Sequence, residues 1–264
     1  MHPQAPSPTG LPASVPIRRA GRPSGQGRTR LFCLPPAGAG ASIFYPWLDA
    51  APPWLEICPV AVPGREDQFR QPLPASIHAL ADALSDALAP ALDRPYAVLG
   101  YSMGAFVGYE LVQRWSRRGW RTPDAFFALA ARSPTAPFDR EEPLHLLNAA
   151  RFREALIDMG GTPREILDNA EAMALFEPIL RNDLRIAETY RPTGPDTAKL
   201  ACTVHAIYSH EDALVEPHHA KAWAECSTQP LTEHVITGPH MPSKTALLAL
   251  LPELTRALKP DTSR

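Results

Sequence analysis

Residues 96–105 read YAVLGYSMGA. The first four, Tyr96–Leu99, form a continuous apolar run of the kind found in strands that are buried on both faces. Apolar and small residues at helical spacing begin at Ala105 and continue to Trp115. Between them lies Gly100-Tyr101-Ser102-Met103-Gly104, a G-x-S-x-G pattern at a strand-to-helix turn. In that context the pattern predicts a nucleophile elbow, which presents Ser102 at a helix N-terminus whose dipole favours a developing oxyanion. The pattern alone also arises by chance, so the prediction depends on the flanking strand and helix.

Five further apolar runs are predicted to be strands, and helical patterns separate them. They are Arg30–Leu34, Glu56–Val62, Ala125–Ala130, Thr203–Tyr208 and Thr232–Ile236, with helical spacing over Ile77–Leu88 and a closing helix over Ala246–Leu258. This alternation predicts an α/β fold with a mostly parallel sheet and helices on both faces. Ligands of such folds bind at the carboxyl ends of the strands.

The stretch from about residue 134 to residue 192 interrupts this alternation, because it contains helical patterns and no convincing strand. The patterns are Arg151–Met159, which ends at Gly160-Gly161, and Ala172–Glu188, which Pro178 is expected to kink or split. We interpret the stretch as a helical lid inserted over the functional site. The alternative is an ordinary pair of crossover helices.

Composition narrows the class of protein. The 31 prolines among 264 residues exceed the usual ~5% and exclude a long coiled coil or helical bundle. The first 30 residues hold five arginines and no acid, so the remaining 21 basic and 28 acidic residues leave the body at −7. That charge argues against nucleic acid as the main partner. No apolar stretch is long enough to cross a membrane.

Residues 1–28 are rich in proline, serine, glycine and arginine and lack a hydrophobic period. We expect them to form a disordered tail before a domain at residues 29–260. The tail lacks the apolar core of a signal peptide, and its prolines disfavour the helix of a transit peptide. Its basic charge also fits docking to an acidic surface.

The four cysteines show no C-x-x-C spacing, which disfavours a zinc site or a disulfide framework. Three of them lie in apolar, strand-like contexts. We expect buried free thiols in a reducing cytoplasm. The four are Cys33, Cys58, Cys202 and Cys226.

A serine nucleophile needs a base and an acid, which in α/β-hydrolases follow it in the order acid, then histidine. His240 lies in a loop between the last strand and the last helix, where the base belongs. Asp212 follows the strand Thr203–Tyr208 and is our choice for the acid, with the neighbouring Glu211 as the rival. The other common position for the acid, after Ala125–Ala130, offers no carboxylate. Other histidines fall in strands, in the inserted stretch or at a helix start: His145, His205, His218, His219 and His234.

An oxyanion hole requires two backbone N–H groups. Met103, directly after the nucleophile, is expected to supply one. The small residues of Pro35–Ser42 allow close backbone approach, and the N–H of Ala37 is the best candidate for the other. A phosphate-binding loop is disfavoured because neither GK[ST] nor G-x-G-x-x-G is present.

Several separated segments resemble the type II thioesterases that accompany non-ribosomal peptide and polyketide synthases. The resemblance covers about residues 30–258. It is carried by the loop Leu34–Phe44, by Val-Pro-Gly-Arg-Glu at 62–66, by the elbow at 100–105, by Gly160–Pro163 with Leu180–Tyr190 in the inserted stretch, and by Asp212. The family usually has Gly-Gly-His followed by two phenylalanines, whereas this chain has Gly-Pro-His-Met-Pro-Ser at 238–243. The departure affects the packing of the base.

The resemblance implies hydrolysis of acyl thioesters held on the phosphopantetheine arm of acyl or peptidyl carrier proteins. His240 would activate Ser102, with Asp212 orienting the imidazole and Ala37 and Met103 holding the oxyanion. No cofactor or metal is expected, because the phosphopantetheine arrives with the substrate. The expected protein is a cytoplasmic monomer that clears misprimed or stalled carriers.

Two alternatives remain open. One is an esterase or acyltransferase acting on free small-molecule esters or acyl-CoA. The other is a carrier-binding module without catalysis, which the intact set of triad residues disfavours. Carrier proteins are commonly acidic, so Arg151, Arg153 and Arg164 are candidates for the docking surface; a solvated helix face explains them equally well.

Overall fold

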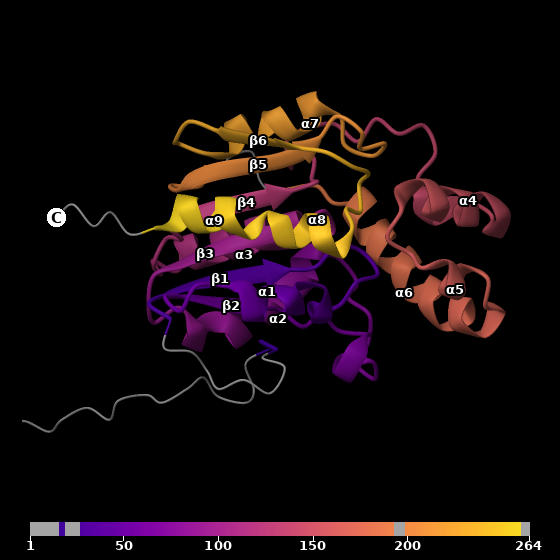
Figure 1. Cartoon of the computed structure of the whole chain (residues 1–264), viewed down its shortest axis with the longest axis horizontal. Helices are drawn as coiled ribbons and strands as arrows, with labels where there is room; N and C mark the ends of the chain where they lie inside the picture. The colour runs from indigo at the N-terminus through magenta and orange to yellow at the C-terminus, as the bar shows by residue number, and fades with distance from the viewer. Residues whose placement is uncertain (1–15, 19–26, 193–198, 260–264) are drawn as a thin grey trace, which may run out of the picture.

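The computed structural model describes residues 16–18, 27–192 and 199–259 of the chain (Figure 1). Six parallel strands form one sheet in the order β2-β1-β3-β4-β5-β6. The predicted α/β fold is thereby confirmed. The strands are β1 (Thr29–Leu34), β2 (Leu55–Pro59), β3 (Tyr96–Tyr101), β4 (Ala125–Leu129), β5 (Thr203–Ser209) and β6 (Thr232–Ile236).

Helices cover both faces of the sheet (Figure 1). On one face pack α1 (Tyr45–Ala50), α8 (Lys244–Ala249) and α9 (Leu251–Leu258), and on the other α2 (Ile77–Leu88), α3 (Met103–Arg117) and α7 (Pro217–Lys221). Successive strand residues point to opposite faces, so Leu31 and Phe32 enter different cores. Short 3-10 helices lie at Ala41–Phe44, Glu66–Gln68, Ala89–Ala91, Leu144–Leu146 and Ala222–Cys226.

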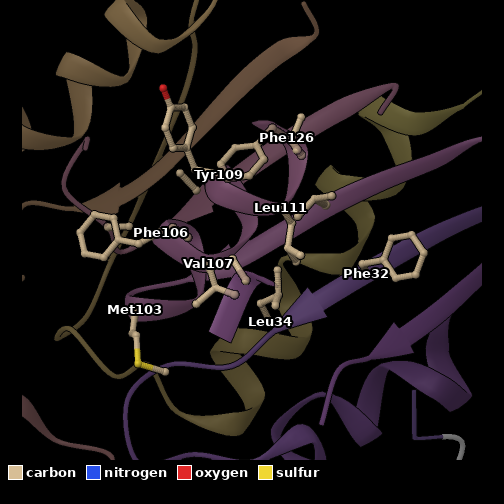
Figure 2. Close-up of a cluster of buried hydrophobic side chains, with 14 of the residues drawn as sticks. Phe32, Leu34, Met103, Phe106, Val107, Tyr109, Leu111 and Phe126 are labelled. Atoms are coloured by element: carbon tan, nitrogen blue, oxygen red, sulfur yellow. The ribbon is translucent and has the colours of Figure 1, made fainter. Parts of the chain in front are cut away.

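Helix α3 is buried over most of its length. Every residue from Met103 to Gln113 is buried. Figure 2 shows side chains of this helix, including Phe106 and Val107, in the same buried cluster as Phe32 of β1 and Phe126 of β4. Because interiors are close-packed, this burial fixes the helix start and therefore the turn that precedes it.

The predicted helical insertion at residues 134–192 contains α4 (Ala149–Met159), α5 (Arg164–Leu167) and α6 (Ala170–Glu188). These helices lie together beyond one end of the sheet, at the right of Figure 1. They share an apolar cluster that also contacts Ala37 and Leu214, which follow β1 and β5. The insertion therefore sits at the carboxyl ends of the strands.

Helix α6 runs without a break through Pro178, so the expected split there is wrong. A proline removes one intrahelical hydrogen bond. The buried contacts of Leu180 and Leu184 on the following turns offset that loss.

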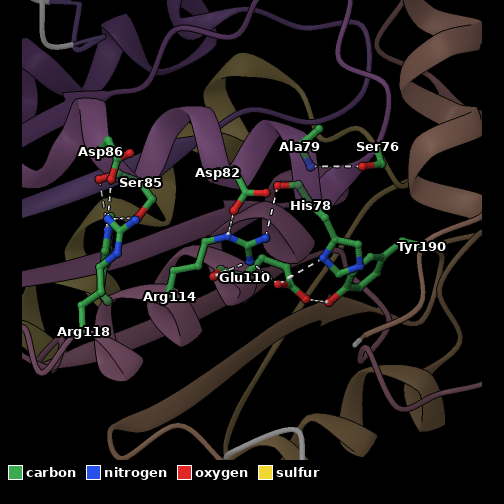
Figure 3. Close-up of polar contacts among 11 residues, drawn as sticks. Ser76, His78, Ala79, Asp82, Ser85, Asp86, Glu110, Arg114, Arg118 and Tyr190 are labelled. Atoms are coloured by element: carbon green, nitrogen blue, oxygen red, sulfur yellow. Dashed lines mark hydrogen bonds and ion pairs between the residues drawn. The ribbon is translucent and has the colours of Figure 1, made fainter. Parts of the chain in front are cut away.

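Polar contacts tie the end of the insertion to the body of the protein (Figure 3). The Tyr190 hydroxyl donates to Glu110 Oε1 of α3 at 2.7 Å. Glu110 also accepts a hydrogen bond from Arg114, and the Nε of this arginine donates to Asp82 of α2 at 2.6 Å. His78 Nε2 of α2 lies 2.9 Å from the carbonyl oxygen of Arg191, the residue that follows Tyr190. The insertion is thus anchored where it rejoins the sheet.

The predicted closing helix is two helices, which meet at Leu250. Pro252 occupies the second position of α9, where its missing N–H has no intrahelical partner to lose. The apolar residues of α8 and α9 follow nearly the same helical period, so the sequence predicted a single helix.

The segment before the domain also differs from the prediction. Residues 16–18 lie against the end of β2: Ile17 forms an antiparallel bridge with Val60 and is buried. The Arg18 N–H donates to Pro59 O at 2.8 Å. An apolar side chain therefore fastens these residues to the core. Residues 1–15 and 19–26 of the predicted tail lie outside the described residues.

All four cysteines are buried and unbonded to one another, as predicted. Within the described part of the chain, every helix is too short or too polar to cross a membrane.

Candidate functional site

Ser102 lies in the turn between β3 and α3, with φ 50° and ψ −115°. That strained conformation is the one expected of a nucleophile elbow. The two glycines are required by space: a Cβ on Gly100 would lie 2.2 Å from the Cα of Ala105, and one on Gly104 would lie 2.3 Å from the carbonyl oxygen of Leu34. The Ser102 N–H donates to Leu129 O at 2.8 Å, which secures the turn against β4.

The imidazole of His240 lies between Ser102 and Asp212. Its Nε2 is 3.0 Å from Ser102 Oγ, and its Nδ1 is 2.8 Å from Asp212 Oδ2 and 3.1 Å from Oδ1. Both the imidazole and the carboxylate are buried. The structure thus brings together three residues that are 28 to 138 positions apart in the chain. This arrangement can move a proton from the hydroxyl to the imidazole while a buried carboxylate balances the resulting charge.

Asp212 is held by its own loop. Its Oδ1 accepts the N–H groups of Leu214 at 2.8 Å and Val215 at 3.1 Å, directly after β5. These bonds aim the carboxylate at the imidazole. Glu211, the rival for the acid, is exposed.

The loop around His240 departs from the family pattern, and the structure shows how it is packed. The Met241 N–H donates to Met159 O at 3.3 Å, and its side chain lies against Gly161 at the end of α4. A Cβ on Gly161 would lie 2.6 Å from the Cβ of Met241. The methionine therefore packs closely against the glycine turn of the insertion.

Tyr101 also holds this loop, a role that was not predicted from the sequence. Its hydroxyl donates to the carbonyl oxygen of His240 at 3.0 Å and contacts Met241 Sδ at 3.2 Å. Burial and the nearby charge of Asp212 raise the pKa of Tyr101, so the hydroxyl keeps its proton and remains a donor. No spacing rule signals this contact, because the two residues are 139 positions apart.

The loop after β1 is held by a carboxylate from the insertion. Asp183 of α6 is fully buried, and its Oδ2 accepts the Gly38 N–H at 2.8 Å. Arg65 forms a two-point ion pair with Asp183 at 2.5 and 3.0 Å and also donates to Ala39 O at 3.2 Å. The N–H of Ala39 bonds to Pro36 O. The bonds of Gly38 and Ala39 thus fix the backbone around Ala37. Both residues lie in segments that carry the family resemblance, but their contact was not predicted from the sequence.

We expect Arg65→Met to destabilise the protein by about 3–5 kcal/mol, because it leaves the Asp183 carboxylate buried without its cation. Denaturant unfolding would measure the loss. The double variant Arg65→Met/Asp183→Leu removes both charges and should lose less than the sum of the two single variants. Additive losses would contradict a coupled buried pair.

A cavity of about 100 Å³ opens beside Ser102 and His240. Its walls are mainly apolar, with contributions from Phe106, Leu184 and Leu214. The lining also includes the charged side chains of Arg132, Asp139, Arg140 and Glu188. One water needs ~10–15 Å³ on this measure, so the cavity has room for a short organic group.

One cluster among the described residues has the composition of a metal site: Asp139, His218 and His219, whose potential ligand atoms lie within 4.8 Å of one another. Asp139 and His218 are exposed, and His219 Nε2 already pairs with Asp139 at 3.1 Å. A contact between a histidine and a carboxylate is common in proteins without a metal, so an ordinary polar pair at the edge of the cavity explains this cluster.

Comparison with known proteins gives three informative matches, and a model of the thioesterase domain family matches residues 29–256. Linear gramicidin dehydrogenase LgrE of Brevibacillus parabrevis is 32% identical, over 80% of this chain and 80% of its own. ClbQ from the colibactin NRPS/PKS pathway is 26% identical with a TM-score of 0.81, covering 88% of this chain and 97% of ClbQ. The type II thioesterase BorB from the borrelidin biosynthetic cluster is 30% identical with a TM-score of 0.83, covering 95% and 100%.

Proposed function

Because the chain belongs to the thioesterase domain family, we propose that it hydrolyses acyl thioesters held on the phosphopantetheine arm of carrier proteins. The carriers are those of a non-ribosomal peptide or polyketide synthase, and the reaction clears misprimed or stalled acyl groups. The resemblance to type II thioesterases drawn from the sequence is confirmed by relatives such as BorB. The observation that carries the proposal is the hydrogen-bonded chain from Ser102 through His240 to Asp212.

In this proposal His240 Nε2 takes the Ser102 proton as Oγ attacks the thioester carbonyl carbon. The 3.0 Å contact is already within the reach that proton transfer requires. Asp212 stabilises the imidazolium, which then protonates the leaving thiol. The neutral His240 then takes a proton from a water that attacks the acyl-enzyme, and it returns this proton to Ser102 Oγ as the bond between Oγ and the acyl group breaks and the acid is released.

The oxyanion of each tetrahedral intermediate is proposed to lie between the N–H groups of Ala37 and Met103. Two features support this assignment. Met103 is the first residue of α3, so its N–H points out of the helix end toward the turn of Ser102. Ala37 lies in the loop whose start packs on Gly104 and whose neighbours are fixed by Asp183.

The chain's own side chains supply the nucleophile, base and acid of this scheme. The phosphopantetheine is part of the substrate and is not a resident cofactor. The proposed partner is therefore an acyl or peptidyl carrier protein. The structure gives little support to the three arginines that were candidates for the docking surface. Two of them already have an acidic partner within the insertion, because Arg151 pairs with Glu142 and Arg153 pairs with Asp168.

The proposal predicts that the enzyme prefers an acyl group on a carrier to the same group on a small thiol. We expect kcat/KM for acetyl- or butyryl-carrier to exceed that for the matching acyl-CoA by at least about tenfold, since protein contacts add binding energy that the small thiol lacks. Release of labelled acid measures both, with the loaded carrier alone as the control.

Equal or faster turnover of acyl-CoA or free esters would instead support the esterase or acyltransferase alternative. Carrier binding without any acyl release would support the non-catalytic module.

A further inference from the structure

Arg132 lies just after β4 and lines the cavity beside Ser102. This strand end is the other common position for the acid of an α/β-hydrolase, and here it carries an arginine in place of a carboxylate. Its Nη1 donates to Ala136 O at 2.9 Å. Its Nη2 is buried and has no hydrogen-bond partner among the described residues. A buried, unsatisfied donor of a charged group is costly, and it is rare in native proteins unless a ligand or water completes it.

The two carboxylates at the cavity wall are already engaged elsewhere. Glu188 accepts the N–H groups of Leu144 at 2.8 Å and His145 at 3.2 Å and also contacts the His145 ring. Asp139 pairs with His219 at 3.1 Å. Among the described residues, neither forms an ion pair with Arg132. The guanidinium therefore lines the cavity without an ion-pair partner among the described residues, although the charges of Asp139 and Glu188 act on it from nearby.

The guanidinium keeps its charge in this setting. Burial, together with the nearby Arg191, lowers the pKa of Arg132 to about 10, which is still well above neutral pH. Its carbon lies 4.8 Å from the centre of the Phe106 ring and 5.7 Å from that of Phe138. Two aromatic rings thus hold the planar group in place by cation–π contact.

We propose that Arg132 binds a carboxylate at the far end of a short acyl group, so that the favoured substrates are dicarboxylic acyl thioesters. The inference rests on the proposed function, because it assigns the cavity beside Ser102 to the acyl chain. Nη2 is free to donate to one carboxylate oxygen, and the mainly apolar lining favours the pairing because opposite charges attract more strongly in surroundings of low polarity. The cavity of about 100 Å³ has room for an acyl group of a few carbon atoms.

Two pairs of thioesters of matched shape test the proposal. Malonyl is compared with isovaleryl, and succinyl with 4-methylpentanoyl, because in each pair a carboxylate replaces an isopropyl group of similar size. The measured quantity is the ratio of kcat/KM for the anionic and neutral members. We expect this ratio to exceed one for at least one pair in the wild type. Arg132→Gln should lower it by about 10- to 100-fold, as expected for a lost charge-assisted hydrogen bond.

Arg132→Lys keeps the charge and should retain part of the ratio. The matched control is Arg117→Gln, which removes an exposed arginine from the last turn of α3, away from the cavity, and should leave the ratio unchanged. Turnover of the neutral thioesters by Arg132→Gln reports whether that variant is folded. If it does not fold, protection of the Ser102→Ala variant against thermal unfolding by free malonate or succinate provides the second measurement, and no protection overturns the proposal.

A wild-type ratio below one for both pairs would overturn the proposal. An equal loss in Arg132→Gln and Arg117→Gln would also overturn it, because the effect would then come from net charge and not from a bound carboxylate. Failure of the proposed function looks different: the wild type would then hydrolyse neither the neutral nor the anionic thioesters.

Discussion

Ser102→Ala is expected to lower the rate of acyl release from a loaded carrier by about 10³- to 10⁶-fold. The variant removes the only atom that the proposal allows to attack the thioester, and His240 is left without a hydroxyl to deprotonate. The elbow itself should survive, because its conformation is fixed by Gly100, Gly104 and the Ser102 backbone bond to Leu129. Single-turnover release of labelled acid would measure the loss.

Ser116→Ala is the matched control, since Ser116 lies on the same helix and is exposed at its far end. It should release acid at the wild-type rate. Mass spectrometry of the wild type mixed with a loaded carrier should find an acyl adduct on Ser102 that the alanine variant lacks. Undiminished release by Ser102→Ala would refute the proposed mechanism.

The proposed triad could be chosen from the sequence because its members follow strands in a fixed order. Ser102 follows β3, Asp212 follows β5 and His240 follows β6, so a parallel sheet carries all three to the same edge. Local patterns therefore sufficed to nominate them. The structure adds the distances that bring the three side chains into contact.

The supporting contacts could not be chosen in this way. Arg65 and Asp183 are 118 positions apart, and the acid lies on a helix whose position no local pattern determines. Tyr101 occupies a position of the elbow motif that accepts many residues. Arg132 stands out only through an unsatisfied nitrogen atom, which is a property of the packed structure. Such contacts depend on tertiary packing and leave no periodic trace in the sequence.

The errors in the fold have the same origin. Pro178 was expected to interrupt α6 on local grounds, but burial of the following turns outweighs one lost hydrogen bond. Ile17 lies in a composition typical of a tail, yet one apolar side chain pairs with Val60 and enters the core. In each case a long-range apolar contact outweighs the local preference.

The buried pair of Arg65 and Asp183 gives the insertion a second role besides covering the cavity. Asp183 belongs to α6 and accepts the N–H of Gly38, next to the proposed oxyanion-hole residue Ala37. The end of α4 packs meanwhile on Met241, next to His240. Displacement of these helices would therefore disturb both the oxyanion loop and the base. The hydrogen bond from Tyr190 to Glu110 holds the end of the insertion against α3 and so opposes such a displacement.

Asp212→Asn should lower kcat by about 10⁴-fold while leaving the fold nearly unchanged. The carboxylate now accepts the proton of His240 Nδ1, which leaves Nε2 free to accept the Ser102 proton. The amide would turn an N–H group toward Nδ1 because its oxygen stays engaged by the N–H groups of Leu214 and Val215. The imidazole would then carry its proton on Nε2 and could not act as the base.

Glu211→Gln makes the same chemical change one residue away, on an exposed side chain, and should retain wild-type kcat. Steady-state hydrolysis of a loaded carrier by the two variants therefore separates the two carboxylates that the sequence left in competition. A severe loss of kcat in Glu211→Gln with a mild loss in Asp212→Asn would show that Glu211 is the acid and that the choice of Asp212 is wrong. Comparable losses in both would show that net negative charge near the loop, and not the imidazole tautomer, controls the rate.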